Sequence, residues 1–372
     1  MVFSHPKKII FCVPRFHTNL VSSVAALKKR GHSVKILSAY VGTTENHFSD
    51  QPLTLPQSPF SRLLIKIFGE GGGDKPNFFP SSANTLRFLI REKPDIVIVR
   101  NPRRIGAIFF IFFGWLLRTK IIIYTQSDFS LWPALKLAIL DLMLLVLGFS
   151  WYSTISSDFK IKQYGKRLFF VPFAVEKHKE ISLRFNNRIL MVGKFEAARK
   201  RHEFFLDIII DLLKNFSFEV WIVGEVSSRR GSERFQCLRE IIANAGHVEE
   251  VRLIKNVAPG SMVEFYSNCD FLVLPSVEEP AAIAPIEALS NGIPAICSDA
   301  CGTQCYIQKG VNGFVFKADD REELFRVLES LLGNKALMLQ LKKNCREFSE
   351  ATPESFLKHL NILCEKSWGF SI

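Results

Sequence analysis

The chain has 372 residues, of which 48% are hydrophobic, and a formal net charge of +12. This length and apolar content exclude a disordered chain or a small disulfide scaffold, and they allow two domains with separate cores. Residues 1–180 hold 25 Lys and Arg against 11 Asp and Glu, whereas residues 181–372 hold 23 against 25. The basic first half therefore indicates an anionic partner, for which membrane phospholipid, a lipid diphosphate and nucleic acid are candidates.

Neither a secretory signal nor a membrane span is predicted. Lys7 and Lys8 precede only a short apolar run, which is typical of a first strand rather than of a signal peptide. The apolar run Ile105–Leu117 is closed by Arg104 and Arg118, and it is well short of the ~18–20 residues that a bilayer requires. Eight scattered Cys without paired spacing favour the reducing cytosol.

Strands and helices alternate along both halves of the chain. In the first half, apolar runs predict strands at 9–13, 33–37, 95–99, 120–124, 151–155 and 169–172, helices at 20–30, 104–117 and 133–147, and a loop-rich segment at 42–85. In the second half they predict strands at 188–192, 219–223, 251–254, 271–274 and 294–297, and later helices at 320–332, 335–350 and 354–367. This alternation indicates an α/β protein with two Rossmann-like domains, whose parallel sheets face a central cleft, and a linker near 173–187.

A glycine-rich turn and three regularly spaced cysteines could each indicate a specialised site. The glycines at 69 and 71–73 predict a mobile turn, and no Lys-Ser or Lys-Thr follows them, so a P-loop is not predicted. Cys297, Cys301 and Cys305 recur every four residues without an obvious fourth ligand, which favours small buried residues over a metal site.

The most informative segment is 275–302, with the sequence PSVEEPAAIAPIEALSNGIPAICSDACG. It follows a predicted buried strand, so Glu279 comes at the carboxyl end of that strand and Glu287 lies in the next helix. Both positions face the ligand crevice of an open α/β sheet. Two carboxylates suit a ligand with many hydroxyls, because each accepts charge-assisted hydrogen bonds. The alternative is an ordinary strand–helix–strand unit whose carboxylates are solvated.

A second segment ends the first strand of the second half with Gly193-Lys194 and places Lys200 six residues later, before a helix. Together the two segments resemble the donor-binding signature of retaining glycosyltransferases with the GT-B fold, family 4, also called glycosyl transferases group 1. The resemblance spans most of residues 188–333. Over residues 1–172 it is limited to strand order and the Gly31-His32 turn.

The resemblance implies a role for each matching residue. Lys194 and Lys200 would hold the donor diphosphate, where fixed cations stabilise the departing group; the alternative is a pair of solvated lysines. Glu279 would bind the sugar near the reacting centre, and Glu287 would accept the ribose hydroxyls. Catalysis would fall to Lys200, Glu279 and Lys194, and the diphosphate would also be approached by the backbone of Gly193, Ala282, Ile283 and Ala284.

The first half departs from the family pattern. The loop 14–19 contains no glycine, and Gln126 stands where relatives often carry a His. Gln cannot shuttle a proton, so Gln126, together with His17 and Asn19, is expected to contact acceptor or sugar hydroxyls. Pro280-Ala281-Ala282 replaces a Gly-rich run, which stiffens the loop after Glu279.

The resemblance thus implies a retaining glycosyltransferase that moves a sugar from a nucleoside diphosphate sugar to a glycan or lipid-linked acceptor. No Asp-x-Asp occurs in the chain, so neither a metal nor another cofactor is expected. Residues 1–175, with 353–372 packed back on them, would bind the acceptor, and 176–352 the donor. The alternatives are a non-catalytic nucleotide-sugar-binding relative and a nucleic-acid-binding protein, although no nucleic-acid motif accompanies the charge.

Two apolar helices, at 105–117 and 131–147, allow two interpretations. Either both helices are core elements packed on the sheet, or one exposes its apolar side chains to the cytoplasmic face of an anionic membrane. In the second case the protein would be cytoplasmic and peripherally attached. The basic residues beside the helices would be Lys28, Lys29, Arg30, Arg103 and Arg104.

Overall fold

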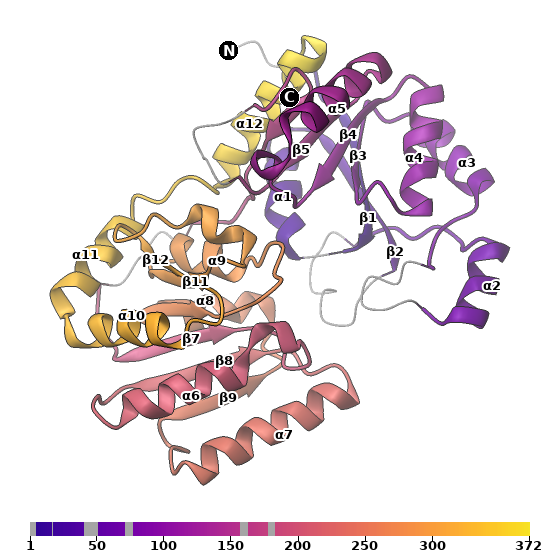
Figure 1. The fold of residues 1–372 in the computed structure, drawn as a ribbon. Coiled ribbons are helices and arrows are strands. Elements are labelled where there is room, and N and C mark those ends of the chain that lie inside the picture. The colour runs from indigo at the N-terminus through magenta and orange to yellow at the C-terminus, as the bar shows by residue number, and fades with distance from the viewer. Residues whose placement is uncertain (1–4, 17, 41–50, 71–76, 157–162, 178–182) are drawn as a thin grey trace. The chain divides into compact units, whose positions relative to one another are not determined.

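The computed structural model describes residues 5–16, 18–40, 51–70, 77–156, 163–177 and 183–372 (Figure 1). The chain divides into two compact units, which we call unit 1 (Met1–Ala174 with Pro353–Ile372) and unit 2 (Val175–Thr352). Each unit contains a six-stranded sheet flanked by helices. All strand pairs in both sheets are parallel, which confirms the α/β class predicted from the alternation of elements.

The sheet of unit 1 has the strand order β2-β1-β3-β4-β5-β6. Its strands are β1 (Lys8–Arg15), β2 (Ser33–Tyr40), β3 (Ile96–Arg100), β4 (Lys120–Thr125), β5 (Ser150–Ser153) and β6 (Leu168–Phe170). The chain leaves β1 for β2 on one side and resumes at β3 on the other. The carboxyl ends of β1 and β3 therefore form the topological switch point of this sheet, where open α/β folds bind ligands.

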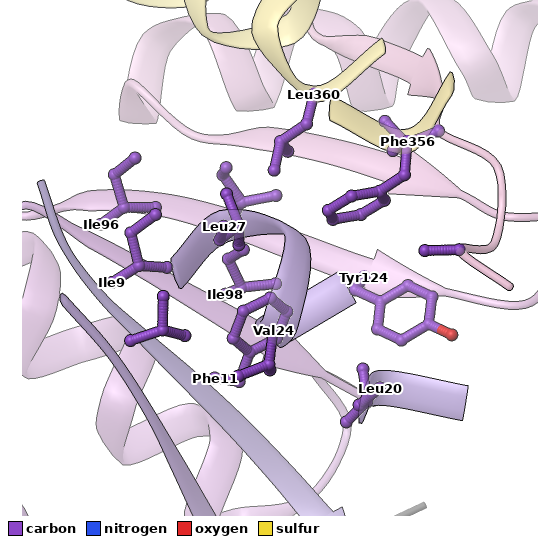
Figure 2. Packing of buried hydrophobic residues seen from close by; sticks show 14 of the residues in the cluster. Ile9, Phe11, Leu20, Val24, Leu27, Ile96, Ile98, Tyr124, Phe356 and Leu360 are labelled. Carbon is purple, nitrogen blue, oxygen red and sulfur yellow. The ribbon is translucent and has the colours of Figure 1, made fainter. Parts of the chain in front are cut away.

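Helices cover both faces of this sheet. One face packs on α1 (Val21–Lys29) and α12 (Pro353–Trp368), and Figure 2 shows Val24 and Leu27 of α1 and Phe356 and Leu360 of α12 against strand residues. The opposite face packs on α3 (Ser82–Glu92), α4 (Ile105–Leu116) and α5 (Ala134–Leu147). Alternate residues of each buried strand enter the two cores, as the period of a strand requires. Short 3₁₀ turns lie at Thr18–Leu20 and Phe129–Leu131.

The segment 42–85, expected to be loop-rich, contains α2 (Pro59–Phe68) and the start of α3, so that prediction is wrong for these residues. Serine caps explain both helices. The Ser58 hydroxyl accepts a hydrogen bond from the Ser61 amide at 2.9 Å, and the Ser81 hydroxyl accepts one from the Asn84 amide at 3.1 Å. Residues 71–73 of the predicted glycine turn lie outside the described residues.

The sheet of unit 2 has the order β12-β11-β10-β7-β8-β9, with its switch point between β7 and β10. Its strands are β7 (Arg188–Val192), β8 (Glu219–Gly224), β9 (Val251–Lys255), β10 (Phe271–Leu274), β11 (Ala295–Ser298) and β12 (Gly313–Phe316). Its helices are α6 (His202–Leu213), α7 (Arg229–Asn244), α8 (Met262–Ser267), α9 (Ala284–Ser290), α10 (Arg321–Gly333) and α11 (Lys335–Cys345), with 3₁₀ turns at Ala198–Lys200, Pro259–Ser261 and Gly302–Tyr306.

Two details of unit 2 differ from the prediction. The strand β12 was not predicted, because it is only four residues long and begins with a glycine. That glycine is required, since a Cβ at Gly313 would lie 1.9 Å from the carbonyl oxygen of Ala295. The helix predicted at 335–350 ends earlier, at Cys345. The remaining predicted elements agree with the structure within a few residues.

A buried ion pair fixes the strands on either side of the switch point. The Nζ of Lys342 lies 2.6 Å from Oδ1 of Asp270, and both side chains are almost fully buried. The Asp270 carboxylate also accepts hydrogen bonds from the amides of Asn186 and Arg188, directly before and at the start of β7. Because each buried charge is paired and hydrogen-bonded, the cluster ties α11 to the beginnings of β7 and β10.

Candidate functional site

Two of the candidate donor residues of unit 2, Lys200 and Glu279, meet at its switch point. Glu279 follows β10, and its buried carboxylate accepts two hydrogen bonds on the same oxygen, Oε2. One comes from Nζ of Lys200 at 2.8 Å and the other from Nε of Arg199 at 3.0 Å. Lys200 is buried as well, whereas Arg199 is exposed. The structure thus brings together two of the predicted residues and adds Arg199, which was not among the predicted site residues.

The backbone holds Glu279 in place independently of its side chain. Its amide donates to the carbonyl of Ala300 at 3.2 Å, and its carbonyl accepts from the amide of Gly302 at 2.9 Å. The preceding residue, Glu278, has φ +50, a left-handed conformation that is unusual for a non-glycine residue. Backbone strain of this kind persists where the surroundings fix it, and it is frequent at ligand sites.

The charges around Glu279 do not cancel. Burial by itself disfavours the ionised carboxyl, but the charges and hydrogen bonds of Lys200 and Arg199 outweigh it, so the pKa of Glu279 lies below its ordinary value. Glu279 is therefore ionised at neutral pH and faces two cations. The group formed by Arg199, Lys200 and Glu279, which we call the cation pair site, carries one surplus positive charge and suits an anionic ligand.

Two structural features set the position of Lys200. A Cβ at Gly193 would lie 3.0 Å from Cγ and Cδ of Lys200, so the glycine leaves room for the lysine stem. Arg201 then turns the chain into α6 with φ +60. His202, the first residue of α6, is buried and stacked on Phe195, with ring centroids 5.2 Å apart. Burial lowers the pKa of His202 to about 4, so this ring is neutral at neutral pH and adds no charge to the site.

Lys194 is engaged elsewhere. It follows β7, as predicted, and it forms an ion pair with Glu225, which follows β8. Its charge is thus balanced by a carboxylate of its own, and it is not one of the two cations on Glu279. The diphosphate role predicted for Lys194 requires that it leave Glu225 or bind the ligand alongside it.

Glu287 lies in α9, and its carboxylate Oε2 accepts a hydrogen bond of 2.6 Å from the buried hydroxyl of Tyr266 in α8. Burial raises the pKa of Glu287, and the Tyr266 hydrogen bond opposes this rise. One carboxylate oxygen, Oε2, is therefore held by the protein. Ala282, Ile283 and Ala284 lead directly into the first turn of α9.

The residues predicted to contact the acceptor lie in unit 1. Gln126 follows β4, where its Oε1 accepts from Nη2 of Arg100 at 3.0 Å and its Nε2 donates to the hydroxyl of Tyr124 at 3.2 Å. The Oδ1 of Asn19 is buried and has no hydrogen-bond partner in the described part of the chain. His17 lies outside the described residues. The structure thus fixes the orientation of the Gln126 amide through Arg100 and Tyr124.

The cysteines that recur every four residues are free thiols. Cys297 and Cys301 are buried, and the Sγ of Cys301 lies 3.1 Å from Oγ1 of Thr303. A hydrogen bond from the Cys297 thiol is the largest cause that lowers the pKa of Cys301 to about 6. Within the described ranges, no group of three or more His, Cys, Asp or Glu side chains is arranged to hold a metal ion.

Three residues of these sites were not predicted from the sequence. Arg199 had a signal, because it directly precedes Lys200 at a predicted strand-to-helix turn. Tyr266 had none, since its partner Glu287 is 21 positions away in the sequence. Arg100 reaches Gln126 from a neighbouring strand, and the two residues are 26 positions apart. Contacts between elements that far apart depend on strand order, which the residue pattern does not give.

Comparison with known proteins places this chain in context. Residues 175–348 match the family model described as "Glycosyl transferases group 1". The chain is 26% identical over 161 residues to the uncharacterized glycosyltransferase MJ1178 of Methanocaldococcus jannaschii, an alignment that covers 43% of this chain and 42% of the relative. It is 27% identical over 126 residues to the D-inositol 3-phosphate glycosyltransferase of Corynebacterium urealyticum, covering 34% of this chain and 30% of the relative. The alignments thus span less than half the length of these curated relatives.

Solved structures resemble the whole chain in fold. A glycosyltransferase from Rickettsia africae superposes with a TM-score of 0.73 at 16% identity, covering 98% of this chain and 100% of that one. HepE of Anabaena, in complex with UDP and glucose, superposes with a TM-score of 0.67 at 12% identity, covering 95% and 98%. The sequence resemblance and the fold prediction are both confirmed: residues 175–348 belong to the glycosyl transferases group 1 family, and the chain that contains them has the GT-B fold.

Proposed function

We propose that this protein is a retaining glycosyltransferase that moves a hexosyl group from a nucleoside diphosphate sugar to an acceptor hydroxyl. The observation that carries the proposal is the cation pair site, where Lys200 and Arg199 share one oxygen of Glu279 at the switch point of unit 2. A sugar diphosphate offers the two groups that this site matches. Its hydroxyls suit the carboxylate, and its phosphate oxygens suit the surplus positive charge.

In the proposed reaction, the bond between the anomeric carbon and the β-phosphate oxygen breaks, and the nucleoside diphosphate leaves with the electron pair. The acceptor oxygen forms the new bond to the same face of the anomeric carbon and gives its proton to the departing phosphate. Lys200 and Arg199 stabilise the charge that grows on the leaving group. Glu279 orients the sugar hydroxyls, and Glu287 accepts from the ribose. Since the protein supplies these cations itself, we propose that transfer needs no metal.

The comparisons support a first choice of ligands. The HepE structure contains UDP and glucose, and the name of the corynebacterial relative specifies a phosphorylated acceptor. We therefore propose UDP-sugars as the first donors to test. As the acceptor we propose either a glycan precursor of a polysaccharide or a lipid-linked sugar. Unit 1 would bind it, with contacts from Asn19, Gln126 and His17.

We propose a cytoplasmic protein attached to an anionic membrane surface through unit 1. The helix α5 buries only Leu144, whereas Leu135 and Val146 are 73% and 78% exposed. Further exposed apolar residues of unit 1 include Phe60, Phe68, Phe112, Trp115, Leu116 and Leu131. Both helices also pack on the sheet, α4 through Ala107 and Phe110 and α5 through Leu144, so each helix is a core element on one side and exposes apolar side chains on the other. No helix among the described residues is long and apolar enough to span a bilayer.

The basic residues expected beside these helices do not form a single group. Lys28–Arg30 end α1, which runs back to the amino edge of the sheet, whereas Arg103 and Arg104 follow β3 at its carboxyl edge. Arg118, after α4, and Lys120, which begins β4, lie at the same amino edge as Lys28–Arg30. Arg118 and Lys120 adjoin the exposed Trp115 and Leu116 in sequence, whereas Lys28–Arg30 end a helix on the opposite face of the sheet. This amino edge is the basic surface we propose for lipid headgroups.

A thermal-shift screen of nucleoside diphosphate sugars tests the donor proposal, followed by product analysis for the ligand that binds. A ligand at ~100 times its dissociation constant adds about 2.7 kcal/mol of stability if it binds only the folded state. Binding with transfer, or with donor hydrolysis, supports the enzyme. Binding without either reaction identifies a non-catalytic relative, and the absence of binding by any nucleotide sugar overturns the proposal.

A further inference from the structure

Unit 1 contains a cavity of about 50 Å³ at the switch point of its own sheet. Its walls come from Val13 and Pro14 near the end of β1, Arg100 at the end of β3, and Arg104 and Gly106 at the start of α4. A cavity at this position is where an open α/β sheet places a ligand. Because a water molecule needs ~10–15 Å³, the volume accommodates a small group but not a whole substrate.

Among the described residues, the lining of the cavity includes two arginines and no carboxylate. Nη2 of Arg100 donates a hydrogen bond of 3.0 Å to the amide oxygen of Gln126, and the guanidinium lies 5.6 Å from the centroid of the Tyr124 ring. Its other terminal nitrogen, Nη1, is buried and has no hydrogen-bond partner in the described part of the chain. A buried donor without a partner is costly, and it is most costly when the donor is charged. An oxyanion at the cavity would satisfy this donor.

The beginning of α4 adds donors of the same kind. Arg104 occupies the N-cap position, and its side chain makes no capping hydrogen bond. The first amides of the helix therefore receive no capping bond from the N-cap side chain, and Gly106 and Ala107 of this first turn line the cavity. A second observation is independent of the helix. Ser38 also lines the cavity, is only 3% exposed, and its hydroxyl has no partner among the described residues.

The remaining walls are mostly apolar, with Leu37, Leu55, Phe78, Phe79 and Phe110 among them. Phe79 approaches α4 closely, since a Cβ at Gly106 would lie 3.3 Å from the Cβ of Phe79. Apolar walls do not stabilise a free inorganic anion, because the anion would lose hydration water against them without compensation. A phosphate ester with an apolar chain matches both parts, since its oxyanion meets the arginines and its chain covers the aromatic side.

We propose that this cavity binds the phosphate or diphosphate group of an amphiphilic acceptor, with the apolar chain beside Phe78, Phe79 and Phe110. The inference rests on the proposed function, because it assigns the class of the acceptor used by unit 1. Gln126, which was predicted to contact the acceptor, is joined to the cavity through Arg100. The same chemistry is offered by free pyrophosphate and by the diphosphate of a lipid-linked acceptor, so the experiment compares the two.

The test is isothermal titration of the full chain with pyrophosphate and with geranyl diphosphate. All proteins carry Lys200→Ala, and all titrations contain excess UDP, so that the donor site is occupied and does not report binding of the two probes. We expect geranyl diphosphate to bind more tightly than pyrophosphate. In the added double variant Arg100→Gln/Arg104→Gln we expect at least about tenfold weaker binding, because charged hydrogen bonds are lost. The matched control Arg103→Gln, an exposed neighbour that does not line the cavity, should bind as the parent does.

Three results would overturn the inference. Equal affinity for the two probes would refute the amphiphilic class. Unchanged affinity in the double variant would refute the site. An effect of Arg103→Gln as large as that of the double variant would show non-specific attraction. Arg104→Lys, which keeps the charge, should retain most of the affinity, and this separates charge from misfolding. Thermal shift with nucleotide sugars, measured on proteins with Lys200 intact, reports the donor site alone. Its failure would refute the proposed function without deciding what the cavity binds.

Discussion

The Nζ of Lys200 lies 2.8 Å from Oε2 of Glu279, although the family resemblance assigns the lysine to the diphosphate and the glutamate to the sugar. Arg199 contacts the same oxygen at 3.0 Å. The two residues therefore hold each other in the position where each would meet its part of the donor. A donor that binds here must replace some of these contacts with contacts to its own oxygens. Substitution of either residue therefore changes the charge that the other residue faces.

Lys200→Ala should lower the turnover number by about 100-fold or more, with a smaller effect on donor affinity. The reason is that a fixed cation stabilises a leaving group most strongly as its charge develops. Steady-state kinetics with varied donor concentration measures both effects. Lys214→Ala is the matched control, because Lys214 is an exposed lysine paired with Asp211 on the same unit. Wild-type turnover in a well-folded Lys200→Ala protein would show that the assignment is wrong.

Glu279→Gln should strengthen the binding of the free nucleoside diphosphate and lower the rate of sugar transfer. The substitution removes the carboxylate that competes for Lys200 and Arg199, so affinity for the free nucleoside diphosphate should rise several-fold. Sugar transfer should fall, because the amide accepts the sugar hydroxyls without charge. Titration calorimetry with the nucleoside diphosphate measures the first effect, with Glu233→Gln, an exposed glutamate paired with Arg229, as control. Weaker binding of the diphosphate in Glu279→Gln would contradict the competition described here.

The sequence predicted most strands, because uninterrupted apolar runs such as those of Arg188–Val192 and Phe271–Leu274 carry a clear pattern. It did not predict β12, whose four residues owe their conformation to pairing with β11. It missed α2, although Ser58-Pro59 is a start signal for a helix, because the prolines at 52 and 56 before it and the glycines from 69 onward favoured a loop.

For the candidate site, the sequence predicted which strand each residue follows but not which residues contact one another. Glu279 and Lys200 lie after β10 and β7, as predicted, because an apolar run followed by polar residues marks where each strand ends. That the two strands are adjacent was not predicted. The direct contact of the two residues was not predicted, since it depends on how the loops after β7 and β10 turn toward each other. Lys194 illustrates the limit: its partner Glu225 is 31 positions later, and only the pairing of β7 with β8 brings the two together.

Tyr266→Phe should make stability more dependent on pH in a defined direction. Burial raises the pKa of Glu287, so its ionised form is disfavoured in the folded state, and this contribution to stability falls as pH rises through the folded pKa. The Tyr266 hydroxyl relieves the penalty at 2.6 Å from the carboxylate. Its loss should cost about 1.5–3 kcal/mol where Glu287 is ionised and less where it is protonated.

Chemical denaturation at about pH 8 and about pH 5 measures this difference, because the two conditions lie above and near the range of a raised carboxyl pKa. In a Glu287→Gln background, Tyr266→Phe should cost the same at both values, since no titratable group remains at that position. A cost that is independent of pH with Glu287 intact would show that the hydrogen bond does not act on its ionised form.

Sugar transfer should survive chelation of divalent metals. Arg199 and Lys200 supply the positive charge at the proposed leaving group, so a metal is not needed to neutralise it. The measurement is the initial rate with and without EDTA, with protein stability followed in parallel. If EDTA abolishes transfer and Mg²⁺ or Mn²⁺ restores it, the account of the leaving group by side chains alone is wrong.

Flotation with liposomes should show reversible binding of the protein to anionic membranes, and binding should decrease with salt. Each basic residue near an anionic surface contributes roughly 1 kcal/mol, and the exposed apolar residues of α4 and α5 add burial in the interface. We expect loss of binding in two variants: one that neutralises Lys28, Lys29, Arg30, Arg118 and Lys120, and one that replaces Leu135, Ile139, Leu142 and Val146 of α5 by Gln.

Neutralisation of Arg229 and Arg230, at the start of α7 in unit 2, is the matched control for charge and should leave flotation unchanged. The membrane proposal fails if the wild-type protein does not float with anionic liposomes at low salt. It also fails if the two unit 1 variants float as the wild type does. A stable dimer in solution that the α5 variant dissociates, without any liposome binding by the wild type, would instead assign this apolar face to a second copy of the chain, since an exposed apolar surface of this extent is typically covered in its working state.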